Sequence, residues 1–238
     1  MPSPYNVHLD DGCGACPARS EEAFCQMSPD STIVLEALKF GSVYPKGSLL
    51  FVEGEKPRGV FILCNGRAKL TTSSRDGKTL IVSIAGPGEI LGVSATILGA
   101  PYEVSAETIE PAHVSFLKRN DFLMFIDSHP DAAMRAVRQL SAKYRTAQRE
   151  IRSLGLSQTA SERLAKLLLD WCDTGEQTPR GVRLKVLLTH EEIAQMIGTS
   201  RETVTRLLSG FKRRHVLEVK GSTVLVQQPD ILRSLVST

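Results

Sequence analysis

The amino-acid sequence predicts an α+β protein with an N-terminal β jelly roll, a long dimerisation helix and a C-terminal winged helix-turn-helix. Three observations predict this order. Short apolar runs separated by glycine turns fill residues 40–122, as in jelly rolls and sandwiches. Apolar side chains then recur in alternating steps of four and three over residues 130–155, which is the pattern of a helical seam. Residues 156–238 hold two short amphipathic segments around a glycine, followed by two β-forming runs.

The composition favours a folded chain. The 238 residues (26.0 kDa) are 42% hydrophobic and 23% charged, with a mean hydropathy of -0.08. Burial can therefore stabilise a core, and wholesale disorder is excluded. No apolar run reaches the roughly 18 residues that a membrane span needs, and residues 1–11 lack the basic and apolar stretches of a secretory leader. We expect a cytoplasmic protein with no membrane partner.

We expect four segments along the chain. They are a cysteine-containing N-terminal segment (1–28), a β domain (29–127), a long helix (128–155) and a winged helix-turn-helix domain (156–238). The net charge of +3 lies in the last segment, where 12 Lys and Arg stand against 9 Asp and Glu, because residues 1–155 carry 17 of each sign. A basic C-terminal part is a weak indication of nucleic-acid binding.

The β region follows a short predicted helix at 29–38. Turn signals separate its apolar runs, and Asn65-Gly66 and Asp76-Gly77 supply the positive φ that tight hairpins require. The runs lie at 49–52, 60–63, 68–71, 80–84 and 114–117. Even spacing of short strands with glycine at most corners predicts a β-sandwich or jelly roll.

The long helix carries a stripe of two apolar positions in every seven. Its members are Val137, Leu140, Tyr144, Ala147, Ile151 and Leu154. Such a stripe is narrower than the face by which a helix usually packs on a globular domain, and it prefers a second helix. We therefore expect a homodimeric coiled coil, and the alternative is that the stripe packs on its own β domain.

Capping residues mark two consecutive helices in the C-terminal segment. Thr189 followed by Glu192 is a capping box that starts the first helix, and Gly198 ends it. Thr199 or Ser200 then caps the second helix. A helix, a glycine turn and a second helix form the helix-turn-helix pattern.

Two β-forming runs follow that pattern. Residues 216–219 and 223–226 predict a two-stranded ribbon, which makes the motif winged. Upstream of the motif, residues 175–181 indicate a polar loop.

The second helix of the motif carries the residues expected to read DNA. Its first turns are the part of such a motif that meets base edges in the major groove. Arginine can donate two hydrogen bonds to guanine, and glutamate can accept from cytosine. The DNA-binding candidates are Thr189, Ser200, Arg201, Glu202, Thr205, Arg206 and Lys212.

Each of these candidates has a plainer interpretation. Arg201 and Arg206 would also suit the solvated face of any small helix. Glu202 could form a second capping box with Thr199. Lys212 suits either a phosphate or the negative end of the helix dipole. The full order of cap, glycine, apolar stripe, basic face and ribbon favours double-stranded DNA as a partner.

These features together resemble the CRP/FNR family of bacterial transcription regulators. The resemblance rests on residues 198–206 and on four glycines of the β region, Gly47, Gly54, Gly66 and Gly88. It implies a cyclic-nucleotide-binding-like β-roll sensor, a homodimer helix and a winged helix-turn-helix. It also implies a sequence-specific regulator that works on double-stranded DNA together with RNA polymerase. In members with an Arg-Glu-x-x-x-Arg pattern it implies a palindromic TGTGA-like site, with Arg201 and Arg206 on guanines and Glu202 on a cytosine.

The same resemblance argues against cyclic AMP as the effector. Members that bind cAMP hold its ribose with a Gly-Glu pair and its phosphate with an Arg-Ser pair. The matching stretches here place Val93 at the ribose glutamate and Tyr102-Glu103 at the Arg-Ser pair. Because a carboxylate repels a phosphate that no cation holds, we expect that the chain does not bind cAMP.

Three clustered cysteines point to a metal or cluster site. Cys13, Cys16 and Cys25 resemble the N-terminal cysteine cluster of FNR-type oxygen sensors, which implies a [4Fe–4S] cofactor held by thiolates. The usual fourth cysteine is replaced by Ser115, so Cys64 is a substitute candidate, although a small buried strand residue is the simpler interpretation for it. Zinc binding and free thiols are the alternatives for the cluster.

Two other functions compete with an effector-controlled regulator. One is an effector-independent architectural DNA binder, which differs only in that its DNA affinity does not respond to a signal. The other is a cupin-like metal enzyme on the jelly roll, which needs closely spaced histidine and carboxylate ligands. The histidines are scattered at 8, 113, 129, 190 and 215, and no Gly-x-Ser-x-Gly motif occurs, so we expect no enzyme.

Overall fold

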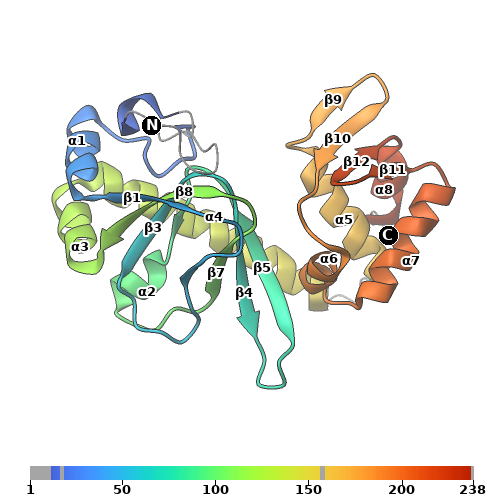
Figure 1. Cartoon of the computed structure of the whole chain (residues 1–238), viewed down its shortest axis with the longest axis horizontal. Coiled ribbons are helices and arrows are strands. Elements are labelled where there is room, and N and C mark those ends of the chain that lie inside the picture. The colour runs from blue at the N-terminus through green and yellow to red at the C-terminus, as the bar shows by residue number, and fades with distance from the viewer. Residues whose placement is uncertain (1–11, 17–18, 156–158, 237–238) are drawn as a thin grey trace. The chain divides into compact units, whose positions relative to one another are not determined.

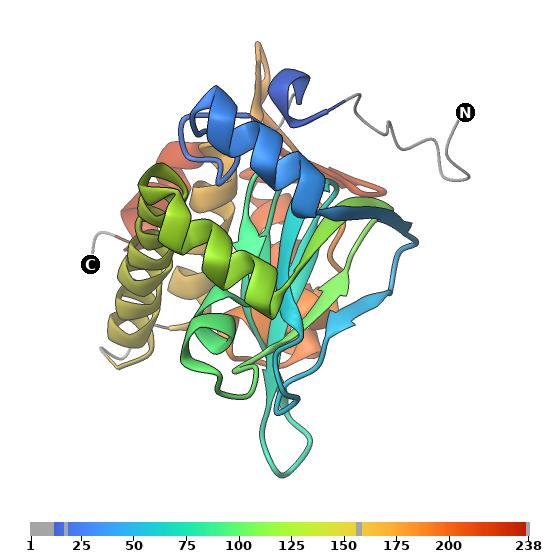
Figure 2. The ribbon, with the colours of Figure 1, turned by 90° about the vertical axis from the view of Figure 1, so that its left-hand side faces the viewer.

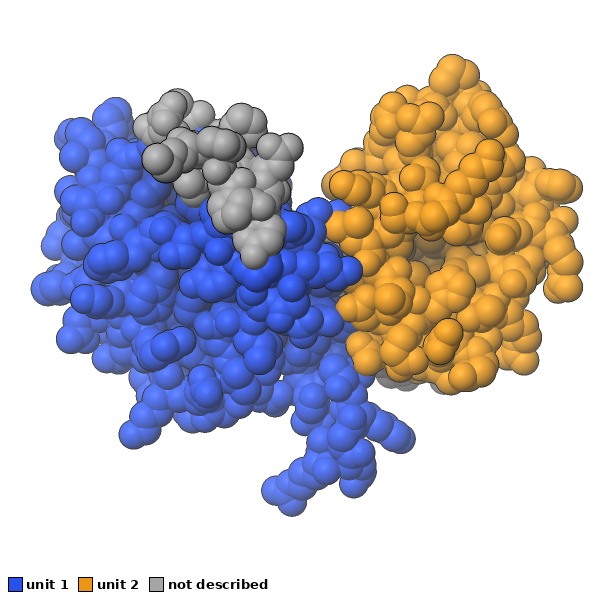
Figure 3. Space-filling model, in the orientation of Figure 1, with its two compact units in different colours: residues 1–147 blue, residues 148–238 orange. Residues whose placement is uncertain are grey.

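The computed structural model describes residues 12–16, 19–155 and 159–236, with the backbone alone described at 15, 149–150 and 152–155 (Figure 1). The chain divides into two compact units, residues 1–147 and 148–238 (Figure 3). The α+β class is confirmed, with a β-roll in the first unit and a winged helix-turn-helix in the second. Within the described residues, no helix is long and apolar enough to cross a membrane.

Two four-stranded antiparallel sheets build the first unit. One has the order β1-β8-β3-β6 and the other β2-β7-β4-β5. The strands are β1 (Phe40–Tyr44), β2 (Leu49–Phe51), β3 (Gly59–Asn65), β4 (Ala68–Ser73), β5 (Thr79–Ala85), β6 (Ile90–Leu91), β7 (Ser105–Thr108) and β8 (Ala112–Lys118). The apolar runs of the sequence correspond to β2, β3, β4, β5 and β8. The strands β1, β6 and β7, which those runs do not include, complete the roll.

Helices cover one side of the first sheet. They are a single 3-10 turn η1 (Cys13–Ala15), α1 (Pro29–Leu38), α2 (Val93–Leu98), α3 (Arg119–Ser128) and α4 (Pro130–Gly155). Figure 2 shows α1 and α3 side by side across the sheet face. Ser28 caps α1 by accepting a hydrogen bond from the backbone N–H of Ser31, and a proline follows at the first helical position.

Strand β3 is buried on both faces from Gly59 to Cys64. Because side chains alternate along a strand, Phe61 and Leu63 pack into the core between the two sheets. Val60, Ile62 and Cys64 pack into a second core beneath the helices. The strand therefore separates the two hydrophobic cores of the unit and contributes to both.

The second unit packs its helices and one sheet around a single core cluster. Its elements are α5 (Ala160–Cys172), β9 (Glu176–Thr178), β10 (Gly181–Lys185), α6 (His190–Ile197), α7 (Arg201–Arg213), β11 (Leu217–Lys220), β12 (Thr223–Val226) and α8 (Pro229–Val236). The predicted ribbon is present as β11 and β12, with the turn between them containing Gly221 at φ 58°.

The prediction of a polar loop at residues 175–181 is wrong. Strand β9 lies there and pairs with β10, which pairs in turn with β12, so the wing belongs to a four-stranded sheet of order β11-β12-β10-β9. The side chains of β9 are at most half-buried, and such a strand carries no apolar alternation that a sequence could show.

We expect Gly59→Ala to destabilise the first unit. A Cβ at Gly59 would lie 1.9 Å from the backbone oxygen of Leu117 on the paired strand, so β3 and β8 would have to separate. Overpacking of this kind costs about 1–3 kcal/mol, which calorimetry would detect as a lower unfolding temperature. Gly86→Ala is the matched control, because a Cβ there has no neighbour within 4 Å among the described residues. Equal unfolding temperatures for the two variants would contradict the packing argument.

Candidate nucleic-acid interface and cysteine cavity

Helix α6 begins at a capping box. The Thr189 hydroxyl accepts from the backbone N–H of Glu192 at 3.2 Å, and the Glu192 carboxylate accepts from the backbone N–H of Thr189 at 2.9 Å. The Thr189 hydroxyl is thus used within the chain, where it fixes the start of the helix.

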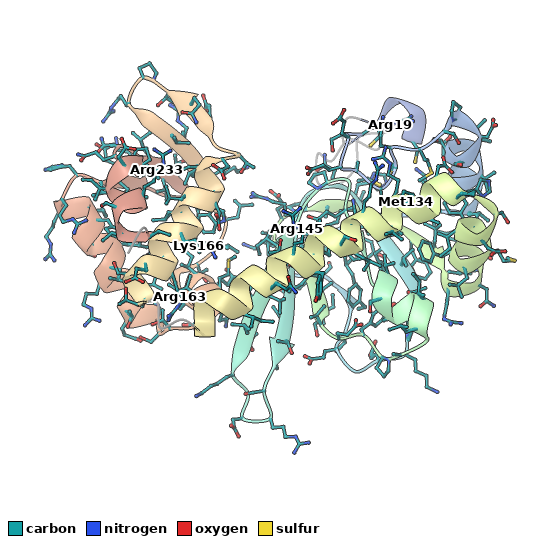
Figure 4. All side chains as sticks on the ribbon, turned by 180° about the vertical axis from the view of Figure 1, so that it is seen from behind. Arg19, Met134, Arg145, Arg163, Lys166 and Arg233 are labelled. Atoms are coloured by element: carbon teal, nitrogen blue, oxygen red, sulfur yellow. The ribbon has the colours of Figure 1, made fainter. Side chains whose placement is uncertain are left out.

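The turn between α6 and α7 is held from a third helix. Gly198 ends α6 in the left-handed conformation at φ 61°, a backbone region in which a side chain is strained. Arg163 of α5 donates to the backbone oxygen of Ile197 at 2.7 Å and to that of Gly198 at 3.4 Å (Figure 4). The cation satisfies carbonyls at the end of α6, a role that the sequence pattern alone did not indicate.

Helix α7 presents the predicted DNA-reading residues to solvent. Ser200 caps it by accepting from the backbone N–H of Thr203 at 3.2 Å. Its buried face consists of Val204, Leu208 and Phe211. The candidates on the other side are all exposed, namely Arg201, Glu202, Thr205, Arg206 and Lys212.

Two local interactions organise the first turns of α7. The pKa of Glu202 is lowered because the Glu202 backbone N–H and the Ser200 hydroxyl bond its carboxylate, so this side chain stays ionised at the helix start. Thr205 donates to the backbone oxygen of Arg201 at 3.0 Å, and its hydroxyl lies 2.9 Å from Nδ1 of His190 on α6. His190 is a neighbour of the reading face that the sequence analysis did not single out.

Four cysteines line one cavity in the first unit. Cys13, Cys16 and Cys25 come from the N-terminal segment and Cys64 from β3, around a space of about 20 Å³. Lys39 and His113 complete much of the lining. None of the four forms a disulfide in the described structure. Among the described residues, no group of three His, Cys, Asp or Glu is arranged to hold a single metal ion.

Cys64 is a neighbour of Ser115, the residue that replaces the fourth cysteine expected from the resemblance. Strands β3 and β8 are paired neighbours, and the Cys64 sulfur lies 3.3 Å from the Ser115 hydroxyl. A thiol missing from β8 is therefore present on the adjacent strand. The structure thus brings the weakest of the four cysteine candidates to the other three.

The charges around this cavity favour one thiolate. The pKa of Cys13 falls to about 6 because the Cys25 thiol and then the Lys39 ammonium bond its sulfur, while burial opposes the change. Lys39 Nζ lies 2.9 Å from the Cys13 sulfur. The pKa of Cys25 is raised because its proton is held by Cys13 and it is buried, and burial also raises the pKa of Cys64.

A second cavity, of about 130 Å³, lies between the roll and α4. Its lining is mostly apolar, with Val93 at the position expected for a ribose-binding glutamate. Glu103 also lines it and accepts from the Ser94 hydroxyl at 2.6 Å. Tyr102 is buried elsewhere, stacked on Phe51 and donating to the backbone oxygen of Gly59 at 2.8 Å.

The apolar stripe of α4 divides between two surroundings. Val137, Tyr144 and Ile151 are 53%, 65% and 69% exposed, and Ala147 is exposed as well. Leu140 instead packs against the core of its own unit, beside the buried Ala132 and Ala136. The side chain of Leu154 lies outside the described residues. The alternative of packing on the β domain therefore holds for Leu140.

Comparisons with known proteins agree with this architecture. A model described as a cyclic nucleotide-binding domain matches residues 42–129, and one described as a Crp-like helix-turn-helix domain matches residues 162–235. The chain is 29% identical over 190 residues to a CRP-like cAMP-activated global transcriptional regulator of Mycobacterium tuberculosis, covering 79% of this chain and 84% of that protein. It is 23% identical over 188 residues to a global nitrogen regulator of Synechocystis, covering 78% and 84%.

Solved structures share the fold. FixK2 from Bradyrhizobium japonicum superposes with a TM-score of 0.73 at 22% identity, covering 83% of this chain and 96% of that one. A CooA mutant from Carboxydothermus hydrogenoformans gives a TM-score of 0.73 at 24% identity, covering 86% and 89%. The matched helix-turn-helix domain and the similar proteins are those of transcriptional regulators, one of them activated by cAMP. This chain belongs to the CRP/FNR family of transcriptional regulators.

Proposed function

We propose that the chain is a homodimer that reads a palindromic TGTGA-like DNA site and that its affinity for this site is set by the state of the cysteine cavity. The observation that carries the proposal is the exposed Arg201, Glu202 and Arg206 face on a helix whose start is capped and whose preceding turn is held by Arg163. RNA polymerase would be the partner in transcription.

The reading face has the chemistry and the length for a short half-site. Arg201 and Arg206 are five residues apart, which is about 7.5 Å along a helix axis and about two base-pair steps of DNA. Both guanidiniums can donate two bonds to guanine, and an ionised Glu202 can accept from cytosine. Lys212, near the far end of α7, suits a phosphate contact.

The exposed part of the α4 stripe supports a homodimer. Val137, Tyr144 and Ile151 are large apolar side chains in solvent on one helix, and a second copy would remove them from water. A dimer would also double the reading face, as an inverted-repeat site requires.

We propose that the cysteine cavity takes a [4Fe–4S] cluster. Its present space of about 20 Å³ is close to that of one water molecule, so the four thiols would have to move apart to admit the cluster. Cys13, Cys16, Cys25 and Cys64 would hold it, because such a cluster takes four thiolates on separate iron atoms and these four line one space. When bound, the cluster would supply sensitivity to oxygen. Lys39, which lines the cavity, would offset the negative charge of the thiolates, and Leu63 and Cys64 of β3 form part of the wall. Loss of the cluster would weaken the dimer seam and release DNA.

We further propose that cAMP is not the signal, although similar regulators are named as cAMP-activated. A cyclic phosphate in the second cavity would meet the Glu103 carboxylate, which would repel it. The preceding residue, Tyr102, points into the core. Lys143 lines the cavity, but its ammonium already lies 3.4 Å from Glu89.

Arg206→Ala tests the DNA proposal. Loss of a bidentate contact should weaken binding to a TGTGA-like inverted repeat by about 1–3 kcal/mol and relax selectivity at that base, as measured by fluorescence anisotropy at fixed salt. Lys212→Ala is the comparison variant, because loss of a phosphate contact should weaken all sequences alike and lower the salt dependence. Equal affinity of the parent protein for the repeat and for a scrambled duplex would refute sequence reading.

Charges placed in the α4 stripe test the dimer. The double variant Tyr144→Glu and Ile151→Glu should sediment as a monomer, because four carboxylates would be buried without partners in the seam. Ala142→Glu introduces the same charge at an exposed position outside the stripe and should leave the dimer intact. A double variant that stays dimeric would place the interface elsewhere.

Iron and sulfide analysis of anoxically purified protein tests the cofactor. We expect iron and acid-labile sulfide in the parent protein, a clear loss in Cys64→Ser, and no loss in Cys172→Ser, whose thiol lies in the other unit. Air exposure should then lower affinity for the inverted repeat. Iron-free protein whose DNA affinity is the same with and without oxygen would favour an effector-independent binder.

A further inference from the structure

A stripe of four polar side chains runs along α4 at intervals of four residues. They are Asp131, Arg135, Gln139 and Lys143. Residues at this interval share a helix face, and here each of the four bonds to the backbone of the cysteine-bearing segment or of residues 88–90. We call this set the polar stripe.

The N-terminal half of the polar stripe holds the segment that carries Cys25. Asp131 accepts from the backbone N–H of Ser28 at 2.8 Å and from the Ser31 hydroxyl at 2.7 Å. These bonds lower the pKa of the Asp131 carboxyl to about 2. Arg135 donates to the backbone oxygen of Glu21. The segment is therefore fastened to α4 on both sides of Cys25.

Gln139 bonds to both cavities. Its Nε2 donates to the backbone oxygen of Glu22 at 2.9 Å and to that of Gly88 at 3.0 Å, and its Oε1 accepts from the backbone N–H of Ile90 at 3.0 Å. Gly88 lines the cysteine cavity, whereas Ile90 and Gln139 itself line the second cavity.

The oxygen of Gly88 is a shared acceptor. The backbone N–H of Phe24, next to Cys25, also donates to it, at 2.8 Å. If the cysteine segment moves, its hydrogen bond to the Gly88 oxygen is lost or that oxygen is displaced. Either change affects the hydrogen bond that Gln139 donates to the same oxygen. Lys143 extends the contact between α4 and residues 88–90. It donates to the backbone oxygen of Ile90 at 3.3 Å, and its ammonium lies 3.4 Å from the Glu89 carboxylate.

The opposite side of the same helix carries the exposed apolar residues. Val137 and Gln139 are two positions apart, which is about 200° around a helix. One face of α4 thus bonds to the sensor loops and the other offers Val137 and Tyr144 to solvent. A displacement of the polar stripe must rotate or shift the apolar side with it.

We propose that Gln139 is the positioning residue of this stripe, coupling the cysteine segment to α4 so that each stabilises the placement of the other. A role of this coupling in regulation rests on the proposed function as a dimeric sensor. The coupling between Gln139 and the cysteine segment does not depend on that proposal.

Gln139→Glu tests the coupling in the full-length, iron-free, reduced chain. The substitution keeps the shape and the acceptor for Ile90 but replaces the donor to Glu22 and Gly88 by a carboxylate oxygen that repels both carbonyls. Cys25, which is 7% exposed, should then react with iodoacetamide about tenfold faster or more, because the segment opens more often. Mass spectrometry of the cysteine peptides gives the rate.

Two references make this result specific. Arg138→Ala removes an exposed side chain from the neighbouring position of α4 and should leave the Cys25 rate unchanged. Cys172, buried in the other unit, reports general unfolding within each sample. No acceleration at Cys25 in Gln139→Glu, or one matched at Cys172, would overturn the coupling.

Amide hydrogen exchange of residues 132–147 separates this inference from the proposed redox control. In the parent protein, exchange should differ between iron-loaded and iron-free samples, and Gln139→Glu should reduce this difference. If the parent protein shows no such difference while Gln139→Glu still exposes Cys25, the redox control is refuted and the coupling stands.

Discussion

The burial of β3 on both faces is the constraint on which the first unit depends. Phe61 and Leu63 belong to the core between the sheets, and Val60, Ile62 and Cys64 belong to the core beneath the helices. Because the alternation cannot slip by one residue without exchanging the two sets, the register of β3 against β8 is strongly specified. The position of Cys64 at the edge of the cysteine cavity follows from that register.

Local chemistry explains why much of the second unit could be predicted. A capping box acts over three residues and a left-handed glycine over one, so Thr189, Gly198 and Ser200 marked both helices of the motif without reference to the rest of the fold. The β roll was predicted as a class for a similar reason, since its apolar runs and turns are local. The functional assignments of the exposed α7 residues remain predictions.

The features that sequence reasoning did not find depend on distant partners. Arg163 acts on carbonyls 34 and 35 residues away, and strand β9 has almost no apolar pattern because its stability comes from pairing with β10. Gln139 and Arg135 of α4 donate to backbone oxygens that lie more than a hundred residues earlier in the chain, and no local pattern indicates such partners. Leu140 was assigned to the seam because the heptad gives spacing but not the direction of each side chain.

The hydrogen bonds from Arg163 to the end of α6 affect which parts of the second unit can move. The Arg163 guanidinium of α5 bonds the last carbonyls of α6. These charge-assisted bonds limit the flexibility of the turn between α6 and α7. We expect α5, α6 and α7 to move as one rigid body. The orientation of α7 is then fixed relative to α5. Bending between α6 and α7 is therefore disfavoured.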